Sequence, residues 1–129
     1  MEFTINCPLV APRLFSPILI RNLSLKFSDL GLSDELSQAV ADLGYTTPTP
    51  IQEKSIPIVL MGRDILGSAQ TGTGKTASFT LPMIDILASG RAKARLPRSL
   101  ILAPTRELAA QVADSFEKFS SYHKLSMAL

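Results

Sequence analysis

The chain has 129 residues, of which 46% are hydrophobic, and it carries a formal net charge of +2. This length suits one domain and is too short for two ordinary ones, and the hydrophobic content excludes a disordered chain. The small charge permits nucleic-acid binding without indicating it, because the basic residues would have to be clustered. No apolar run is long enough to span a bilayer, and the single cysteine, Cys7, fits a reducing compartment.

Residues 1–24 are expected to form an irregular extension of unknown role. Pro8, Pro12 and Pro17 stand among apolar residues there, and this density of proline argues against a helix or a central strand. A secretory signal is not expected, because Glu2 lies where positive charge is needed. The domain itself is therefore expected to cover residues 25–129.

Two helices are predicted next. Ser33 can cap the first helix, and Gly44 suits its C-terminal cap. The apolar positions of this helix are Leu36, Ala39, Val40 and Leu43. Thr49 as N-cap and Pro50 at the first helical position begin the second helix, and Pro57 is expected to end it or to begin another.

The strongest chemical signal follows a short apolar run at residues 64–67, which is predicted to be a strand. A glycine-rich turn comes next, before a segment that can be helical, and this order is typical of a phosphate-binding loop. The residues of the loop are Ala69, Gln70, Thr71, Gly72, Thr73, Gly74, Lys75 and Thr76. The two glycines can take backbone angles closed to other residues, so that N–H groups approach a phosphate. The helix N-terminus points its dipole at the same place.

Two residues at the end of this loop carry the candidate catalytic roles. Lys75 would reach the β- and γ-phosphates of a nucleotide, and the Thr76 hydroxyl would ligate Mg²⁺. The general pattern has glycine where this chain has Ala69, so the pattern alone identifies the site less firmly. The alternative is a glycine-rich turn before a helix, but a Gly-Lys-Thr sequence between a strand and a helix favours the phosphate site.

The second half of the chain repeats the alternation of helix and strand. Residues 77–87 are predicted to be a helix that Pro82 kinks, with Leu81, Ile84 and Leu87 toward a core. The polar linker at residues 89–98 holds the basic residues Arg91, Lys93, Arg95 and Arg98. A solvated loop is favoured over a nucleic-acid patch for this linker.

Residues 99–103 are predicted to be a buried parallel strand, and residues 124–129 the opening of another. Between them, Thr105 begins a helix whose apolar face holds Leu108, Val112, Phe116 and Phe119. His123 is expected at the surface. The order of elements predicts an α/β fold: a parallel sheet with flanking helices and a nucleotide at the carboxyl ends of the strands.

Three stretches together resemble motifs of the DEAD-box ATP-dependent RNA helicases, the bacterial members most of all. The Q motif corresponds to residues 44–52, with Phe27 seventeen residues upstream of Gly44. Motif I corresponds to residues 69–76, and the family normally has alanine at the position of Ala69. Motif Ia corresponds to residues 104–109. The resemblance runs from about Phe27 to the end of the chain and implies a RecA-like P-loop fold that binds ATP with Mg²⁺.

The resemblance also implies roles for single residues. Gln52 would read the adenine edge, and its amide donor and acceptor match the N6 donor and N7 acceptor of adenine. Phe27 would stack on the base, and Tyr45 belongs to the same motif. Thr105 and Arg106 would contact RNA phosphates without reading sequence. The alternatives are a polar surface glutamine at position 52 and a simple helix cap at Thr105.

The family's Asp-Glu-Ala-Asp box and its second RecA-like domain are not in this sequence. The chain is therefore expected to be the N-terminal part of the first RecA-like domain of a cytoplasmic protein. By itself it is expected neither to hydrolyse ATP at a useful rate nor to unwind RNA. With three strands of a larger sheet, it is also expected to be poorly soluble or partly molten.

Two other classes of function are compatible with these residues. Another P-loop nucleotide enzyme, such as a small kinase or a GTPase, would share the loop but has no reason to place an adenine reader upstream of it. A non-enzymatic module would bind RNA or a partner protein without turnover.

Overall fold

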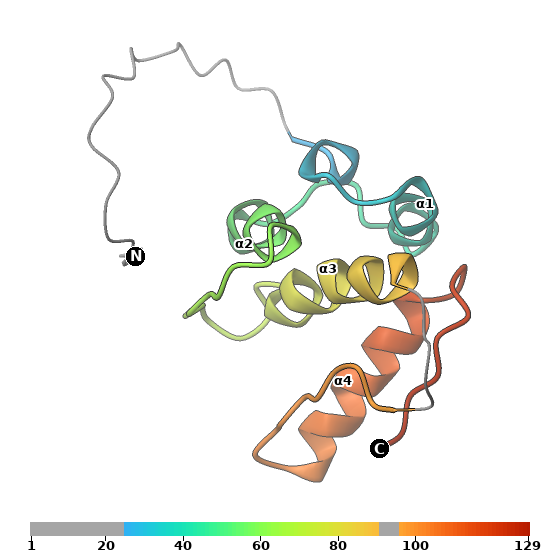
Figure 1. Ribbon diagram of the computed structural model, residues 1–129. Coiled ribbons are helices and arrows are strands. Elements are labelled where there is room, and N and C mark those ends of the chain that lie inside the picture. Colours follow the sequence, from blue (N-terminus) through green and yellow to red (C-terminus); the bar gives the residue numbers. More distant parts are fainter. Residues whose placement is uncertain (1–24, 91–95) are drawn as a thin grey trace.

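A computed structural model describes residues 25–90 and 96–129 of the chain. Its elements are the 3₁₀ helix η1 (Phe27–Leu30), α1 (Asp34–Asp42), α2 (Pro50–Leu60), α3 (Lys75–Ser89) and α4 (Arg106–Phe119). Helix α3 crosses the middle of the described part, with α1 and α2 on one side and α4 on the other (Figure 1). The expected extension at residues 1–24, and three of the four basic residues of the linker, lie outside the described residues.

The core is formed by side chains from η1 and from the helices α1, α2, α3 and α4. Leu36, Ile56 and Ile84 have no exposed surface, and Leu81 is 1% exposed. Burying side chains of this size stabilises the fold by about 1.5–3 kcal/mol each. The predicted inward positions of α1 and α3 are confirmed except at Leu43, which is 41% exposed.

The prediction that α2 would end or restart at Pro57 is wrong. The helix continues through Pro57 to Leu60, and the Pro57 carbonyl accepts a hydrogen bond from the Met61 N–H at 3.1 Å. The φ angle of proline is close to the helical value, so proline can stand in a helix. Because proline lacks an N–H group, Pro57 removes one backbone hydrogen bond, and it does so near the C-terminal end of α2. Pro82 likewise lies inside α3 and is buried; the kink predicted there stays a prediction.

Helix α1 begins after Ser33 as predicted, but Ser33 does not cap it with its side chain. The Ser33 hydroxyl is buried and has no hydrogen-bond partner. Instead, the Ser33 N–H donates to the Asp85 carboxylate of α3 at 3.2 Å. The start of α1 is thus held by a residue far along the chain, which local sequence signals do not indicate.

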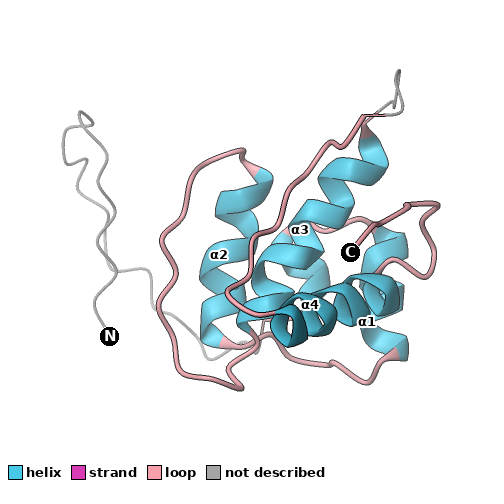
Figure 2. Cartoon of the chain, turned by 90° about the horizontal axis from the view of Figure 1, so that it is seen from below, coloured by secondary structure: helices cyan, strands magenta, loops and turns pink. Residues whose placement is uncertain are grey.

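The described residues contain no strand, and Figure 2 draws the segments predicted as strands as loops. A strand exists only where its backbone pairs with a neighbour, and no backbone hydrogen bond joins residues 64–67 to residues 99–103. Leu66, Leu100 and Leu102 are 95%, 80% and 85% exposed. The predicted burial of residues 99–103 is therefore wrong in this structure, and the parallel sheet is not confirmed.

The last helix agrees best with its predicted start. The Thr105 hydroxyl oxygen accepts a hydrogen bond from the Leu108 N–H at 3.2 Å and so caps α4. Val112, Phe116 and Phe119 are buried as predicted, whereas Leu108 is 39% exposed. His123 was expected at the surface, but it is half-buried and its Nε2 atom is buried without a hydrogen-bond partner.

Candidate phosphate-binding loop

The loop before α3 has the backbone that a phosphate site needs. Gly72 and Gly74 have φ angles of 79° and 81°, in the left-handed region that favours glycine. Gly74 is the N-cap of α3, which begins at Lys75. The N–H groups of the first helical turn have no partners within the helix, so they are available to an anion at this end. The predicted turn and helix are confirmed, although the strand before them is not.

Helix α2 contacts this loop through side chains at its first turn. The Thr49 hydroxyl donates to the Thr73 carbonyl at 2.9 Å. The Gln52 side-chain amide donates through Nε2 to the Gly74 carbonyl at 3.2 Å, and its Oε1 accepts from the Thr49 N–H at 2.9 Å. The two predicted motifs at residues 44–52 and 69–76 therefore meet in space, through hydrogen bonds that cross more than twenty residues of sequence.

Gln52 is 2% exposed, and both groups of its amide are engaged. An amide has two N–H groups and two acceptor lone pairs, so one of each is left for another partner. A surface glutamine is excluded by the burial. Reading adenine stays a prediction, and it requires the base either to share this amide or to displace its backbone partners.

Gly74 is constrained by α2 as well as by its own backbone. A Cβ atom at this position would overlap Gln52 Nε2, and it would lie 3.2 Å from Gln52 Cδ and 3.4 Å from Thr49 Oγ1. At Gly72, by contrast, nothing lies within 4 Å of such an atom. Glycine at position 74 thus allows α2 to approach the loop closely.

Inside the loop, polar side chains bond to nearby carbonyl groups. The Lys75 ammonium donates to the Ala69 carbonyl, and the Thr73 hydroxyl donates to the Gln70 carbonyl at 2.8 Å. A phosphate would offer the ammonium a charged acceptor in place of a neutral one, and such hydrogen bonds are roughly twice as strong. The donors present here are the Lys75 ammonium and the N–H groups at the N-terminus of α3, and donors of these kinds fit a polyphosphate. Gln70, Thr71 and Gly72 are exposed, while Thr76 is half-buried in the first turn of α3.

The other predicted site residues lie in different surroundings. Phe27 is 5% exposed and belongs to the hydrophobic core, so stacking on a base would require its ring to be uncovered. Tyr45 is half exposed, and its ring centroid lies 5.9 Å from that of Phe119. Thr105 and Arg106 are exposed at the start of α4. Their roles toward base and RNA stay predictions.

A hydrogen bond between charged and polar side chains joins the end of α1 to the residues after α4. The Tyr122 hydroxyl donates to Asp42 Oδ2 at 2.6 Å, and Gln38 donates to the other oxygen at 2.7 Å. The Tyr122 bond, with a smaller effect from Gln38, holds the pKa of Asp42 below its ordinary value. The same bond and the carboxylate charge raise the pKa of Tyr122. The Asp42–Tyr122 pair therefore connects the end of α1 to the segment that follows α4.

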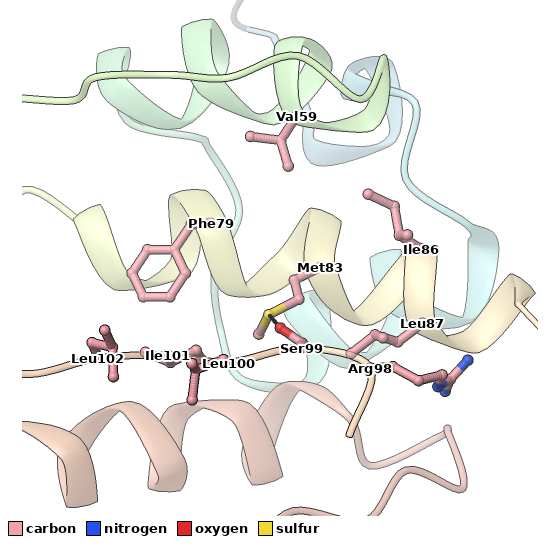
Figure 3. A pocket seen from close by; sticks show the side chains of 10 residues that line it. All are labelled: Val59, Phe79, Met83, Ile86, Leu87, Arg98, Ser99, Leu100, Ile101 and Leu102. Carbon is pink, nitrogen blue, oxygen red and sulfur yellow. Dashed lines mark hydrogen bonds between the residues drawn. The ribbon is translucent and has the colours of Figure 1, made fainter. Parts of the chain in front are cut away.

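An open groove of about 470 Å³ lies between α3 and the loop at residues 98–102 (Figure 3). Phe79, Met83 and Leu87 of α3 form one wall, and Val59 of α2 also lines it. Its lining is almost entirely apolar, with Arg98 turned toward Gly90, whose carbonyl accepts from it at 3.0 Å. The groove therefore does not supply the polar groups of a nucleotide site.

Residues 25–90 and 96–129 hold no group of three or more histidine, cysteine, aspartate or glutamate side chains placed to bind a metal. None of the helices in this part of the chain combines the length and apolar character that crossing a membrane requires.

Sequence reasoning missed two polar contacts of α2, that of Thr49 with the loop and that of Ser55 with the Ser78 carbonyl of α3. Ser55 is buried, and its hydroxyl donates to the Ile51 carbonyl at 2.6 Å and lies 3.4 Å from the Ser78 carbonyl. Polar residues stand at every third position of this segment, which is otherwise rich in apolar residues: Thr49, Gln52 and Ser55. This spacing places the three side chains on one face of α2. It was the sequence signal from which a polar contact of that face could have been predicted.

Comparison with known proteins agrees with the motifs. The family model described as DEAD/DEAH box helicase matches residues 49–129. The ATP-dependent rRNA helicase rrp-3 of Neurospora crassa is 52% identical over 103 residues, which are 80% of this chain and 19% of that protein. The ATP-dependent RNA helicase DeaD of Haemophilus influenzae is 52% identical over 98 residues, or 76% of this chain and 16% of that one.

Solved structures give the same result. The RNA helicase Prp28 from Chaetomium thermophilum, bound to ADP, superimposes with a TM-score of 0.70 at 43% identity, over 79% of this chain and 25% of that one. A DEAD box protein from Methanococcus jannaschii gives a TM-score of 0.68 at 39% identity, over 79% of this chain and 27% of that one. The chain thus spans a fifth or less of the curated relatives described here and about a quarter of the solved ones.

Proposed function

Because the chain belongs to the DEAD/DEAH box helicase family, we propose that it is the ATP-binding portion of an ATP-dependent RNA helicase. Residues 25–129 would form the N-terminal part of a RecA-like domain, in which the segments at residues 64–67 and 99–103 become strands of a parallel sheet. The observation that carries this proposal is the contact of Gln52 and Thr49 with the glycine-rich loop that opens α3. A P-loop kinase or GTPase has no reason to place a buried glutamine there.

The residues of the loop and Gln52 of α2 would each bind a different part of the nucleotide. The N–H groups of residues 72–76 and the Lys75 ammonium would bind the phosphates, since they are donors at a helix N-terminus. The Thr76 hydroxyl would ligate the Mg²⁺ that accompanies ATP, and Gln52 would read the adenine edge. Bound Mg²⁺ would neutralise charge on the phosphates, which is the chemistry that it supplies in phosphoryl transfer.

RNA would be bound at the exposed start of α4. Thr105 and Arg106 lie there, where the N–H groups of Arg106 and Glu107 have no partner within the helix, and this combination suits a phosphate of an RNA backbone. Such contacts carry no sequence information, so little sequence preference is expected.

We place the protein in the cytoplasm, in keeping with its single cysteine. The 129-residue chain alone would neither hydrolyse ATP at a useful rate nor unwind RNA.

The test is displacement of a labelled ATP analogue with Mg²⁺ by ATP or GTP, with circular dichroism measured on the same samples. We expect ATP to displace the analogue at lower concentration than GTP, and Lys75→Ala to abolish binding. In Gln52→Ala the ATP-to-GTP ratio should fall toward one. The matched control is Gln111→Ala, which removes an exposed glutamine of α4.

The ratio is the decisive quantity, because Gln52→Ala also removes a contact with the loop and will weaken every nucleotide. Equal displacement by ATP and GTP in the unsubstituted chain would leave a phosphate loop and exclude an adenine site. Absence of binding by a folded sample would refute the nucleotide site itself.

A further inference from the structure

We propose that the surface where the ends of α1 and α4 meet binds a basic, arginine-bearing segment of a partner protein. The surface consists of Asp42, Leu43, Tyr45 and Tyr122 and is named the tyrosine surface. It combines exposed aromatic rings with a carboxylate, and a guanidinium can contact groups of both kinds at once.

Two contacts between distant residues bring the parts of this surface together. The Tyr122 hydroxyl donates to Asp42 Oδ2 at 2.6 Å. The ring centroid of Tyr45 lies 5.9 Å from that of Phe119, with an angle of 55° between the ring planes. Figure 1 shows the C-terminal end of α4 pointing toward α1. Residues that follow two different helices therefore form one surface, with Leu43 between Asp42 and Tyr45 in the sequence.

The apolar side chains of the tyrosine surface are exposed and two of them are held in place. Leu43, Tyr45 and Tyr122 are 41%, 48% and 55% exposed. Because the contacts with Phe119 and Asp42 hold the two tyrosine rings, a partner would cost these rings little further rotamer freedom. None of the three residues lies in a segment predicted to be a strand, so completion of a sheet gives no reason to cover them. Exposed tyrosines that are already ordered are typical of a protein interface.

The charge beside the tyrosine surface indicates the charge of the partner. Residues 27–53 contain five acidic residues and no basic one. Glu35 and Asp42 are exposed and seven residues apart, so they share a face of α1 about 10 Å long. Lys118 and Lys124, near the end of α4, are fewer than these acids, and the surface keeps a negative excess. Such a surface repels nucleic-acid phosphates and attracts a cationic peptide.

The groups present favour arginine over lysine. A guanidinium stacks on an aromatic ring and also pairs with a carboxylate, whereas an ammonium is a strongly hydrated point charge. Asp42 accepts from Tyr122 through one oxygen and from Gln38 through the other at 2.7 Å, which leaves lone pairs on the carboxylate for an incoming donor. Leu43 beside these groups offers a contact for an apolar side chain of the same segment.

The tyrosine surface lies at the opposite end of α4 from Thr105 and Arg106. Helix α4 has 14 residues, so its two ends are about 20 Å apart. A partner at the tyrosine surface would therefore leave the start of α4 open to RNA. The inference goes beyond the proposed function and does not depend on it.

The test measures the binding of labelled model peptides to the full 129-residue chain by fluorescence anisotropy. One peptide is made of arginine, leucine and alanine, a second has lysine in place of arginine, and a third has serine in place of leucine. The first should bind most tightly, because the second loses the stacking and the third loses the apolar contact. The experiment uses no nucleotide, so its result is separate from the role predicted for Tyr45 at the nucleotide site.

Substitutions on the tyrosine surface should weaken the arginine peptide. Tyr45→Leu removes the aromatic ring and keeps an apolar side chain against Phe119, and we expect about a 2- to 5-fold loss of affinity. Asp42→Asn removes the charge and keeps an acceptor, with a loss of about the same size. The matched control is Asp64→Asn, which removes an exposed carboxylate before the phosphate loop and should leave the affinity unchanged.

Amide signals of the ¹⁵N-labelled, unsubstituted chain locate the peptide, and they decide the question even where a variant fails to fold. Shifts centred on residues 42–45 and 119–122 would support the proposal. Shifts centred on residues 98–102 would place the peptide in the apolar groove and would overturn it. Absence of binding would overturn it as well. Equal weakening by Asp42→Asn and Asp64→Asn would indicate a general attraction to acidic residues, and it too would count against the tyrosine surface.

Discussion

Replacement of Gly74 by alanine tests the close packing of α2 against the phosphate loop. Alanine at a φ of +81° costs about 1–2 kcal/mol in backbone energy. The added Cβ would also overlap Gln52 Nε2, so the buried amide must move and its bond to the Gly74 carbonyl is lost. An unsatisfied buried amide costs about 1–3 kcal/mol. The free energy of unfolding should therefore fall by about 2–5 kcal/mol.

Gly72→Ala separates these two contributions. Gly72 has nearly the same φ, but nothing lies within 4 Å of an added Cβ, so this variant carries the backbone cost alone. The assay is urea unfolding without nucleotide, followed by circular dichroism. The difference between the two variants should equal the cost of displacing Gln52, about 1–3 kcal/mol.

A double-mutant cycle with Gln52→Ala completes this test. When the glutamine is shortened, the overlap disappears, and Gly74→Ala should then cost no more than Gly72→Ala. Equal destabilisation by Gly72→Ala and Gly74→Ala in the unsubstituted chain would refute the reasoning, because it would mean that α2 does not lie against the loop.

Two further predictions concern other surfaces. Tyr122→Phe should lower the melting temperature by a few degrees at most. The lowered pKa of Asp42 and the raised pKa of Tyr122 mean that this bond stabilises between about pH 4 and 10. The effect should be lost as acid protonates Asp42 below its ordinary pKa or as alkali ionises Tyr122 above its ordinary pKa, and a loss of the same size at every pH would contradict it. Leu100 and Leu102 are largely exposed, so replacing both with lysine should raise the monomer fraction in analytical ultracentrifugation; an unchanged fraction would show that this surface does not associate.

Local signals were enough to predict where α2, α3 and α4 begin. Thr49 and Pro50 begin α2, Gly74 precedes α3, and Thr105 caps α4, in each case because the residue supplies a backbone conformation or an acceptor that a helix start requires. The glycine-rich loop was predicted for the same reason. The error at Pro57 came from treating proline as a helix end, although it interrupts only one bond of the ladder.

Contacts between distant residues could not be predicted in this way. Asp85 bonds to Ser33 across fifty-two positions, and Thr49 to Thr73 across twenty-four. A strand has the same difficulty, because its existence depends on a partner that its own residues do not specify. Residues 64–67 and 99–103 have the apolar composition of buried strands, yet here they pair with nothing and leave Leu66 exposed.

The position of Gln52 links the two ends of the proposed nucleotide site. Its amide bonds to the carbonyl of Gly74, and the family resemblance assigns the same amide to adenine. If adenine displaces the carbonyl, the Gly74–Lys75 peptide is released, so binding the base changes the affinity for the phosphates. By linkage, binding the phosphates must change the affinity for the base by the same factor.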